Sequence, residues 1–152
     1  MTAPVNARPS YNPFSQAATE AVSAQAEHVA ATRQSKPWGQ EVIFADGSHG
    51  YVGKLITVMA GQSLSLQLHQ RKDETISVVS GEVLFESGPS ADDLESTTML
   101  PGDTVHVPPT AVHRITAVTD VLLVEVSTAG PGWREDIERL ADVYGREGTS
   151  AP

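Results

Sequence analysis

Residues 61–81 read GQSLSLQLHQRKDETISVVSG, and residues 102–113 read GDTVHVPPTAVH. Both stretches contain short β-type runs bounded by glycine or proline turns. Because successive side chains of a strand point to opposite faces, Ser65, Gln67 and His69 would share one face, with leucines on the other. Such a strand fits the wall of a barrel whose polar lumen has room for one small ligand.

The same pattern extends along most of the chain. Eight segments are predicted as strands, at residues 41–44, 51–59, 63–69, 75–79, 82–86, 104–107, 112–118 and 121–127. Short strands at this spacing, with no helical pattern between them, indicate an all-β sandwich or small barrel. A helix is predicted after them at residues 134–144, where Ile137, Leu140 and Tyr144 would share one face. Gly145 would end that helix.

The N-terminal segment differs in composition from the rest. Residues 1–35 are rich in alanine, serine, threonine and glutamine, and they contain no leucine, isoleucine or tryptophan. Residues 15–33 could form a single helix, because alanine favours helix, and the alternative is a flexible leader. The expected organisation is a leader over residues 1–35, one β domain over residues 36–147 and a tail over residues 148–152.

Composition and charge narrow the function classes. A chain of 152 residues fits one domain, and the absence of cysteine excludes disulfide frameworks, cysteine-ligated metal sites and thiol nucleophiles. The net charge of −9 argues against nucleic acid or an anionic membrane as partner. No apolar run approaches the length of a membrane span, and no signal-peptide pattern opens the chain. A cytoplasmic location is therefore expected.

Four polar side chains from the two quoted stretches form a candidate metal site: Gln67, His69, Glu74 and His113. Together they offer two imidazole nitrogens and two oxygens. This set suits one divalent ion, and Zn²⁺, Fe²⁺, Mn²⁺ and Ni²⁺ all accept such ligands. A catalytic ion would keep an open position for water or substrate.

The spacing of these residues resembles the two sequence motifs of the cupins. The first motif corresponds to Gly61-x5-Gln67-x-His69-x4-Glu74-x6-Gly81, and the second to Gly102-x5-Pro108 followed by His113. Gln67 stands where the family has its first histidine, and Thr110 stands where it has glycine. The resemblance implies a double-stranded β-helix, or jelly-roll barrel, with a metal ion held by the motif residues.

Within the cupins, the chain is similar to the C-terminal domain of type II mannose-6-phosphate isomerases over roughly residues 36–146. The matching pieces are KPWG at 36–39, LSLQLH at 64–69, HR at 113–114, EDI at 135–137 and DVYGR at 142–146. The resemblance implies metal-dependent isomerisation of a sugar phosphate, with zinc as the first choice of ion. The stretch QRKD at 70–73 departs from the family, so the mouth of the site differs from that of the isomerases.

The resemblance also suggests roles for charged residues. Three groups are candidates for the base that moves a proton between adjacent carbons: Glu125, Lys54 and a water molecule bound to the metal ion. An anionic small-molecule substrate would be held by four cations: Arg71, Lys72, Arg114 and Arg146.

Two other functions stay open at this level. One is a metal-dependent dioxygenase or other tailoring enzyme, and the other is a non-catalytic cupin that binds a small molecule. Dependence of the reaction on dioxygen would separate the dioxygenase from the isomerase. Absence of any metal-dependent activity would indicate the binding protein.

A homodimer is expected from the leucine face of the quoted strand. Leu64, Leu66 and Leu68 would form an aliphatic surface that a single barrel wall leaves partly uncovered. Two-fold dimers are the commonest soluble oligomers, so a second copy is the expected cover. The N-terminal segment could cover the same face within one chain.

Overall fold

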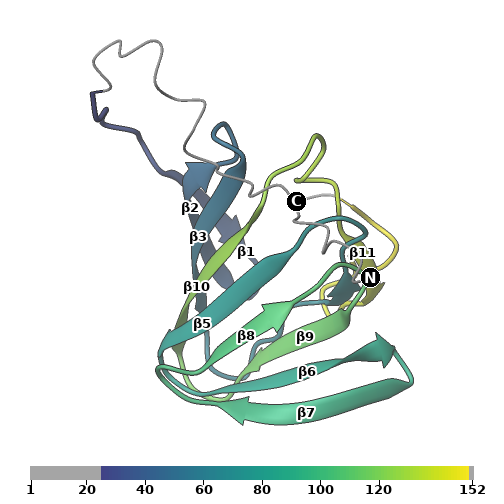
Figure 1. The fold of residues 1–152 in the computed structure, drawn as a ribbon. Coiled ribbons are helices and arrows are strands. Elements are labelled where there is room, and N and C mark those ends of the chain that lie inside the picture. The colour runs from purple at the N-terminus through teal and green to yellow at the C-terminus, as the bar shows by residue number, and fades with distance from the viewer. Residues whose placement is uncertain (1–24, 151–152) are drawn as a thin grey trace, which may run out of the picture.

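Two β-sheets make up the regular structure of the computed structural model, which describes residues 25–150 (Figure 1). Sheet A consists of β1 (Thr32–Lys36), β2 (Gly39–Asp46), β3 (Tyr51–Val58), β5 (Glu74–Ser80), β8 (Thr104–Val107) and β10 (Val121–Thr128). Sheet B consists of β4 (Leu66–Leu68), β6 (Val83–Ser90), β7 (Asp93–Met99), β9 (Val112–Ala117) and β11 (Glu138–Ala141). The spatial order is β1-β2-β3-β10-β5-β8 in sheet A and β11-β4-β9-β6-β7 in sheet B.

The inward side chains of sheet A change character along its three central strands, β3, β10 and β5. In β10, every second side chain is buried, and these buried positions run from the aliphatic Val121 and Leu123 to the acidic Glu125. β3 and β5 show the same change at the same end of the sheet, where they carry Lys54 and Glu74. The aliphatic halves of these strands belong to one hydrophobic core, shared with β6 and β9 of sheet B. The charged halves therefore face the lumen at the other end.

The all-β expectation is confirmed, and each of the eight predicted strands overlaps an observed one. β8 has the predicted bounds, whereas the strand predicted at residues 63–69 shortens to β4. Ser63, at its predicted start, makes only an isolated bridge to Thr116. Three observed strands, β1, β7 and β11, lie where the sequence predicts none.

The helix predicted at residues 134–144 is wrong. β11 occupies part of this segment and pairs antiparallel with β4, with Arg139 opposite Gln67. Arg139 is buried, whereas the next residue, Leu140, is 37% exposed, which is the alternation of a strand. Without β11, β4 would be an edge strand with unpaired backbone groups, so pairing outweighs the helical preference of the isolated segment.

The helix predicted at residues 15–33 is not found in its described part. Residues 25–31 have no regular structure, and the chain enters β1 at Thr32. β1 pairs with β2 along its whole length, so it belongs to the barrel although it begins ahead of residue 36. The remainder of the predicted helix, residues 15–24, lies outside the described residues.

The leucine face of the quoted strand is largely covered. Leu66 is 6% exposed, and Leu64 and Leu68 are half-buried. The homodimer stays a prediction, but these leucines leave little exposed apolar surface for its interface.

Among residues 25–150, no helix is long and apolar enough to cross a membrane. The cytoplasmic location stays a prediction from the sequence.

Candidate metal centre

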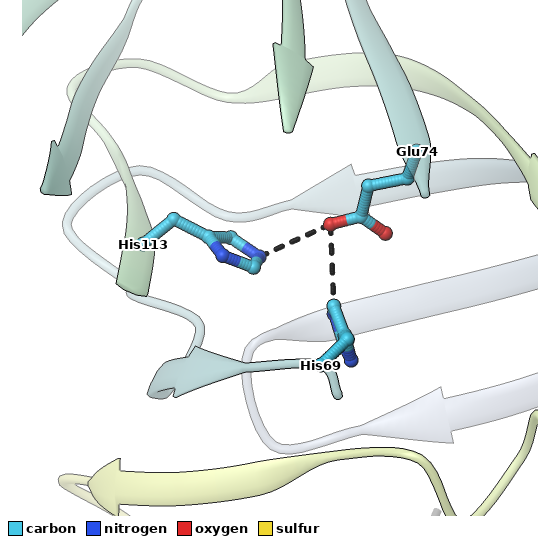
Figure 2. A group of neighbouring side chains, drawn as sticks. All are labelled: His69, Glu74 and His113. Carbon is cyan, nitrogen blue, oxygen red and sulfur yellow. Dashed lines mark ion pairs between the residues drawn. The ribbon is translucent and has the colours of Figure 1, made fainter. Parts of the chain in front are cut away.

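Three side chains that are distant in sequence meet at the charged end of the lumen. His69 directly follows β4, Glu74 is the first residue of β5, and His113 lies near the start of β9. One ligating atom from each lies within 4.8 Å of the others, and all three residues are buried. Figure 2 shows both imidazole rings directed at the same carboxylate oxygen.

The hydrogen bonds of the two rings fix which nitrogen is free. The Nδ1 of His69 contacts the backbone carbonyl oxygen of Asp136, and the Nδ1 of His113 lies 3.0 Å from that of Ala111. A carbonyl oxygen can only accept, so each Nδ1 carries the hydrogen and each neutral ring presents a bare Nε2 lone pair.

Those two lone pairs face a carboxylate oxygen. Glu74 Oε1 lies 3.1 Å from His113 Nε2 and 3.5 Å from His69 Nε2. His69 Nε2 is buried and has no hydrogen-bond partner within the described part of the chain. Three lone pairs converging in a buried space repel one another unless positive charge lies between them. These donors therefore fit a divalent metal ion.

Glu74 is held in its ionised form at this position. Burial alone would raise its pKa, but hydrogen bonds from His113 and His69, which form when their Nε2 atoms carry protons in place of a metal ion, and the ammonium of Lys72 lower the pKa well below its ordinary value. A ligating carboxylate must be deprotonated, so this environment prepares Glu74 for a metal.

Gln67, the fourth predicted ligand, lies beside this group. It is paired with His113 across β4 and β9, and it lines the same lumen. Its side-chain oxygen Oε1 accepts a hydrogen bond of 2.6 Å from Ser65. The second lone pair of that oxygen stays available, and its role as a ligand stays a prediction.

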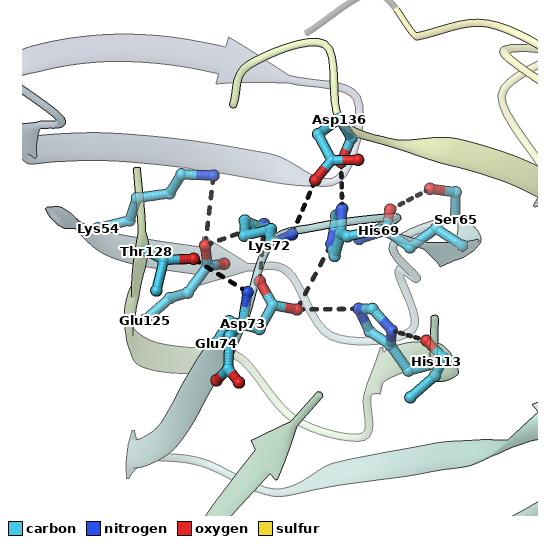
Figure 3. Close-up of polar contacts among 12 residues, drawn as sticks. Lys54, Ser65, His69, Lys72, Asp73, Glu74, His113, Glu125, Thr128 and Asp136 are labelled. Atoms are coloured by element: carbon cyan, nitrogen blue, oxygen red, sulfur yellow. Dashed lines mark hydrogen bonds and ion pairs between the residues drawn. The ribbon is translucent and has the colours of Figure 1, made fainter. Parts of the chain in front are cut away.

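Lys72 lies inside the site rather than at its mouth (Figure 3). Its Nζ lies 2.7 Å from Glu74 Oε2 and 3.4 Å from Glu125 Oε1, and the residue is 8% exposed. Burial alone would lower its pKa, but the carboxylates of Glu125 and Glu74 raise the pKa of Lys72 above its ordinary value. Lys72 thus orients Glu74 through the oxygen that the imidazoles do not face.

A row of alternating charges continues from Lys72 across sheet A. Glu125 Oε1 lies 3.6 Å from Lys54 Nζ, and Lys54 Nζ lies 3.5 Å from a carboxylate oxygen of Glu41. Glu41 also contacts Lys36, at 3.6 Å. The row lines one wall of a cavity, here called the main cavity, which His69 and Gln67 also line. Both candidate bases, Glu125 and Lys54, are thus adjacent to the metal centre.

The other predicted substrate cations are distributed more widely. Arg114 forms a paired contact with Glu86, at 2.6 and 2.9 Å, which occupies its guanidinium. Arg71 donates to the carbonyl of Pro131 and lines a separate hollow. Only Lys72 and Arg146, of the four predicted cations, line the main cavity.

Asp136 is a positioning residue that sequence reasoning missed. Its carboxylate accepts hydrogen bonds from three successive backbone N–H groups, those of Gln70 (2.8 Å), Arg71 (3.0 Å) and Lys72 (2.8 Å). Its own carbonyl oxygen contacts His69, as described above, so one residue holds both a ligand ring and the loop that carries Lys72. Asp136 lies more than 60 positions from these residues in sequence, and no local sequence pattern indicates a contact over that separation.

Comparison with known proteins identifies relatives of this chain. The family model described as Mannose-6-phosphate isomerase C-terminal matches residues 23–142. The alginate biosynthesis protein AlgA of Pseudomonas aeruginosa is 34% identical over 113 residues, which are 73% of this chain and 22% of AlgA. The chain therefore spans about a fifth of the length of this relative.

Solved structures support the fold. The capsular polysaccharide assembling protein CapF from Staphylococcus aureus matches with a TM-score of 0.64 and 16% identity, over 76% of this chain and 35% of CapF. A mutant of Bacillus subtilis oxalate decarboxylase OxdC matches with a TM-score of 0.57 and 19% identity, over 64% of this chain and 27% of OxdC.

The two-sheet barrel, with histidines and a carboxylate buried at one end of its lumen, defines a cupin. Within the cupins, this chain belongs to the family of mannose-6-phosphate isomerase C-terminal domains.

Proposed function

We propose that this chain is a metal-dependent cupin enzyme that isomerises a sugar phosphate. The observation that carries the proposal is the convergence of His69, Glu74 and His113 beside a charged cavity. Family membership supports the reaction class. AlgA is named for alginate biosynthesis and CapF for capsular polysaccharide assembly, which supports a saccharide as the ligand.

In this proposal, His69, Glu74 and His113, together with Gln67, hold one divalent ion, with zinc as the first choice. The ion would act as a Lewis acid that polarises the sugar carbonyl and its neighbouring hydroxyl. Asp136 and Ala111 fix the ring orientations through their carbonyl groups.

Glu125 is proposed as the base. Its carboxylate lies between the ammonium groups of Lys54 and Lys72 and lines the main cavity. It would take the proton from the carbon next to the carbonyl and return it to the former carbonyl carbon, while the proton of the neighbouring hydroxyl passes to the former carbonyl oxygen, so no net proton is gained or lost. The ammonium groups of Lys54 and Lys72 hold the carboxylate in place. Lys54 is the alternative base, and it would first have to lose its proton to act as one.

The test is the aldose–ketose interconversion of mannose 6-phosphate by the purified chain. We expect turnover that EDTA abolishes and that added zinc restores. Glu125→Gln should lower kcat by about 10²–10⁴-fold, the usual contribution of general base catalysis. Glu95→Gln, at an exposed position of β7, is the matched control and should leave kcat unchanged.

Turnover that persists in EDTA, or in Glu125→Gln, would contradict the proposal. Consumption of dioxygen by the metal-loaded protein would instead indicate an oxygenase. Ligand binding without turnover of any sugar phosphate would indicate a non-catalytic cupin.

A further inference from the structure

Three basic side chains gather where the edge strands of the two sheets come to the main cavity. Lys36 is the last residue of β1, the edge of sheet A, and Arg139 lies in β11, the edge of sheet B. Arg146 follows β11 in the chain. All three line the main cavity.

The strand register directs Arg139 into the lumen. Arg139 is paired with Gln67, and Gln67 is paired with His113, so the three residues form one row across β11, β4 and β9. Paired residues of neighbouring strands project to the same face of a sheet. Two strand spacings separate Arg139 from His113, about 10 Å between their Cα atoms. The cations therefore lie within the span of one small ligand that also reaches the metal centre.

The charge of this cluster is incompletely balanced. Arg139 is 6% exposed and donates through Nη1 to the carbonyl and the hydroxyl of Thr149, both of which are neutral. Its Nε is buried and has no hydrogen-bond partner among residues 25–150. Burial and the nearby charge of Arg146 lower the pKa of Arg139, although the carboxylates of Asp142 and Glu41 oppose this shift.

The acidic neighbours of the cluster are already engaged. Glu41 contacts both Lys36 and Lys54. Asp142 binds the guanidinium of Arg146 through two contacts, at 2.7 and 3.2 Å, so Nη1 is the nitrogen of Arg146 that is left for a further ligand. Burial is the largest cause that lowers the pKa of Lys36, and the charges of Lys54 and Arg146 add to it, although Glu41 opposes them. Six basic residues line the main cavity, Lys36, Lys54, Lys72, Arg134, Arg139 and Arg146, against three acidic ones. Glu74 and Asp142 pair with Lys72 and Arg146 from outside this lining, so the local excess is one positive charge. In a chain of net charge −9, this local excess of positive charge favours an anionic ligand.

We propose that Lys36, Arg139 and Arg146 form the subsite for a phosphate monoester, at the end of the main cavity away from the metal centre. This inference rests on the proposed function, and it replaces most of the cation set expected from the sequence. A phosphate monoester carries nearly two negative charges at neutral pH and offers three acceptor oxygens, which matches three converging cations better than a single carboxylate does.

The test measures binding of inorganic phosphate to the metal-free chain by isothermal titration calorimetry, with acetate as a monocarboxylate probe. We expect saturable binding of phosphate at millimolar concentration, and much weaker binding of acetate. Arg139→Gln and Lys36→Met should each weaken phosphate binding by about tenfold or more. Arg33→Gln removes one positive charge from an exposed position of β1 outside the cavity, so it should leave the affinity nearly unchanged.

Circular dichroism establishes that each variant is folded. Should Arg139→Gln unfold, Lys36→Met decides the question, because its side chain comes from the opposite sheet. The subsite is overturned if the wild type does not bind phosphate, if acetate binds equally well, or if both cavity variants bind phosphate like the wild type.

The failure of this subsite and the failure of the proposed function are distinguishable. Phosphate binding that depends on Arg139 and Lys36, without isomerase activity, would support the subsite and contradict the isomerase. Isomerase activity with an unchanged KM for mannose 6-phosphate in Arg139→Gln would support the isomerase and overturn the subsite.

Discussion

Both ligand imidazoles are oriented by carbonyl groups of the backbone, so each presents its Nε2 to the metal centre without rearrangement. Removal of one imidazole leaves three protein donors at most, so that water, a weaker ligand, must complete the tetrahedral set. We expect His113→Ala to weaken zinc binding by about 100-fold or more, since a change of a supporting group alone costs 10–100-fold. Calorimetric titration of the EDTA-treated chain with zinc measures this.

His106→Ala is the matched control for that titration. Its side chain is 58% exposed and pairs with Asp73 at the surface, so zinc affinity should stay at the wild-type value. Full zinc affinity in both His113→Ala and His69→Ala would show that the ion binds elsewhere.

The carboxylate of Asp136 makes the stability of the fold depend on pH. Partial burial alone would raise its pKa, but the backbone N–H groups of Gln70, Lys72 and Arg71 lower the pKa of Asp136 below its ordinary value. Because the folded-state pKa is lowered, the ionised carboxylate stabilises the fold at pH values above the unfolded-state pKa, which is near 4. This stabilisation is lost as the pH falls through the folded-state pKa. Asp136→Asn should therefore lower the free energy of unfolding by about 1–3 kcal/mol at pH 7.

Urea denaturation at pH 7 and near pH 3 tests this expectation. The difference between the wild type and Asp136→Asn should shrink at the lower pH, because the unfolded chain takes up the proton at a higher pH than the folded chain does. Asp92→Asn, at an exposed turn position, controls for the change in net charge. A difference that is the same at both pH values would contradict the assigned role of the carboxylate.

Residue types and spacing were enough to select the groups that meet at the metal centre. His69, Glu74 and His113 are named by the motif spacing, and the structure brings their ligating atoms together. The spacing could not indicate Arg139, because its approach to the cavity depends on pairing between β11 and β4, which are far apart in sequence. Lys36 was not indicated because it lies in β1, a polar edge strand that was not predicted. Nor could the spacing show that the guanidinium of Arg114 is paired with the carboxylate of Glu86, which lies opposite it in the neighbouring strand.

Among the elements, the turn between β5 and β6 depends on a glycine. Gly81 has a φ of +85°, and an added Cβ would overlap the carbonyl oxygen of Asp120 and the side chain of Val121. Gly81→Ala should lower the free energy of unfolding by about 2–4 kcal/mol, from backbone strain together with this overlap. Thermal or urea denaturation measures the change.

Gly102→Ala separates the two causes. Gly102 has a φ of +96°, but an added Cβ there has open space. The change should therefore cost only the backbone strain, about 1–2 kcal/mol. Equal losses in the two variants would show that the overlap at Gly81 is relieved by a small movement.

The strands that the sequence did not predict are all edge strands. β1, β7 and β11 lie at the margins of the two sheets, and each pairs on one side only. An edge strand is exposed along one side, so β1 and β7 carry mostly polar, exposed residues and lack a clear alternation of polar and apolar side chains. The interior strands β3, β5, β9 and β10 alternate over most of their length because one of their faces is buried, and these strands were predicted.

For the whole molecule, the dimer prediction moves to a different surface. The outward face of sheet A carries Phe44, Leu55 and Val126, which are 43%, 37% and 50% exposed. Val126 is paired with Gly53, and the ring of Phe44 lies over that same glycine, so these side chains form one patch. An uncharged patch of this kind suits a two-fold contact between identical chains.

Light scattering coupled to size-exclusion chromatography tests this prediction. The wild type should elute as a dimer at micromolar concentration, and Val126→Glu should shift it to the monomer, because the carboxylate would be buried without a partner. Val118→Glu, with a similar exposure of 52% at the end of β9, should leave the dimer intact. A monomeric wild type would contradict the prediction.

The position of β10 between β3 and β5 determines when sheet A can form during synthesis of the chain. Translation releases β1, β2 and β3 first and β5 later, yet these two parts of sheet A have no contact through hydrogen bonds until residues 121–128 emerge. Until then, the aliphatic rows of β3 and β5 lack their central neighbour, and the nascent chain carries unpaired strand edges of the kind that aggregate. Folding of sheet A must therefore follow the synthesis of its last strand, and closing such non-local pairs is slow. The strand that completes the core also delivers Glu125, so a chain truncated before β10 would lose the hydrophobic core and the proposed base together.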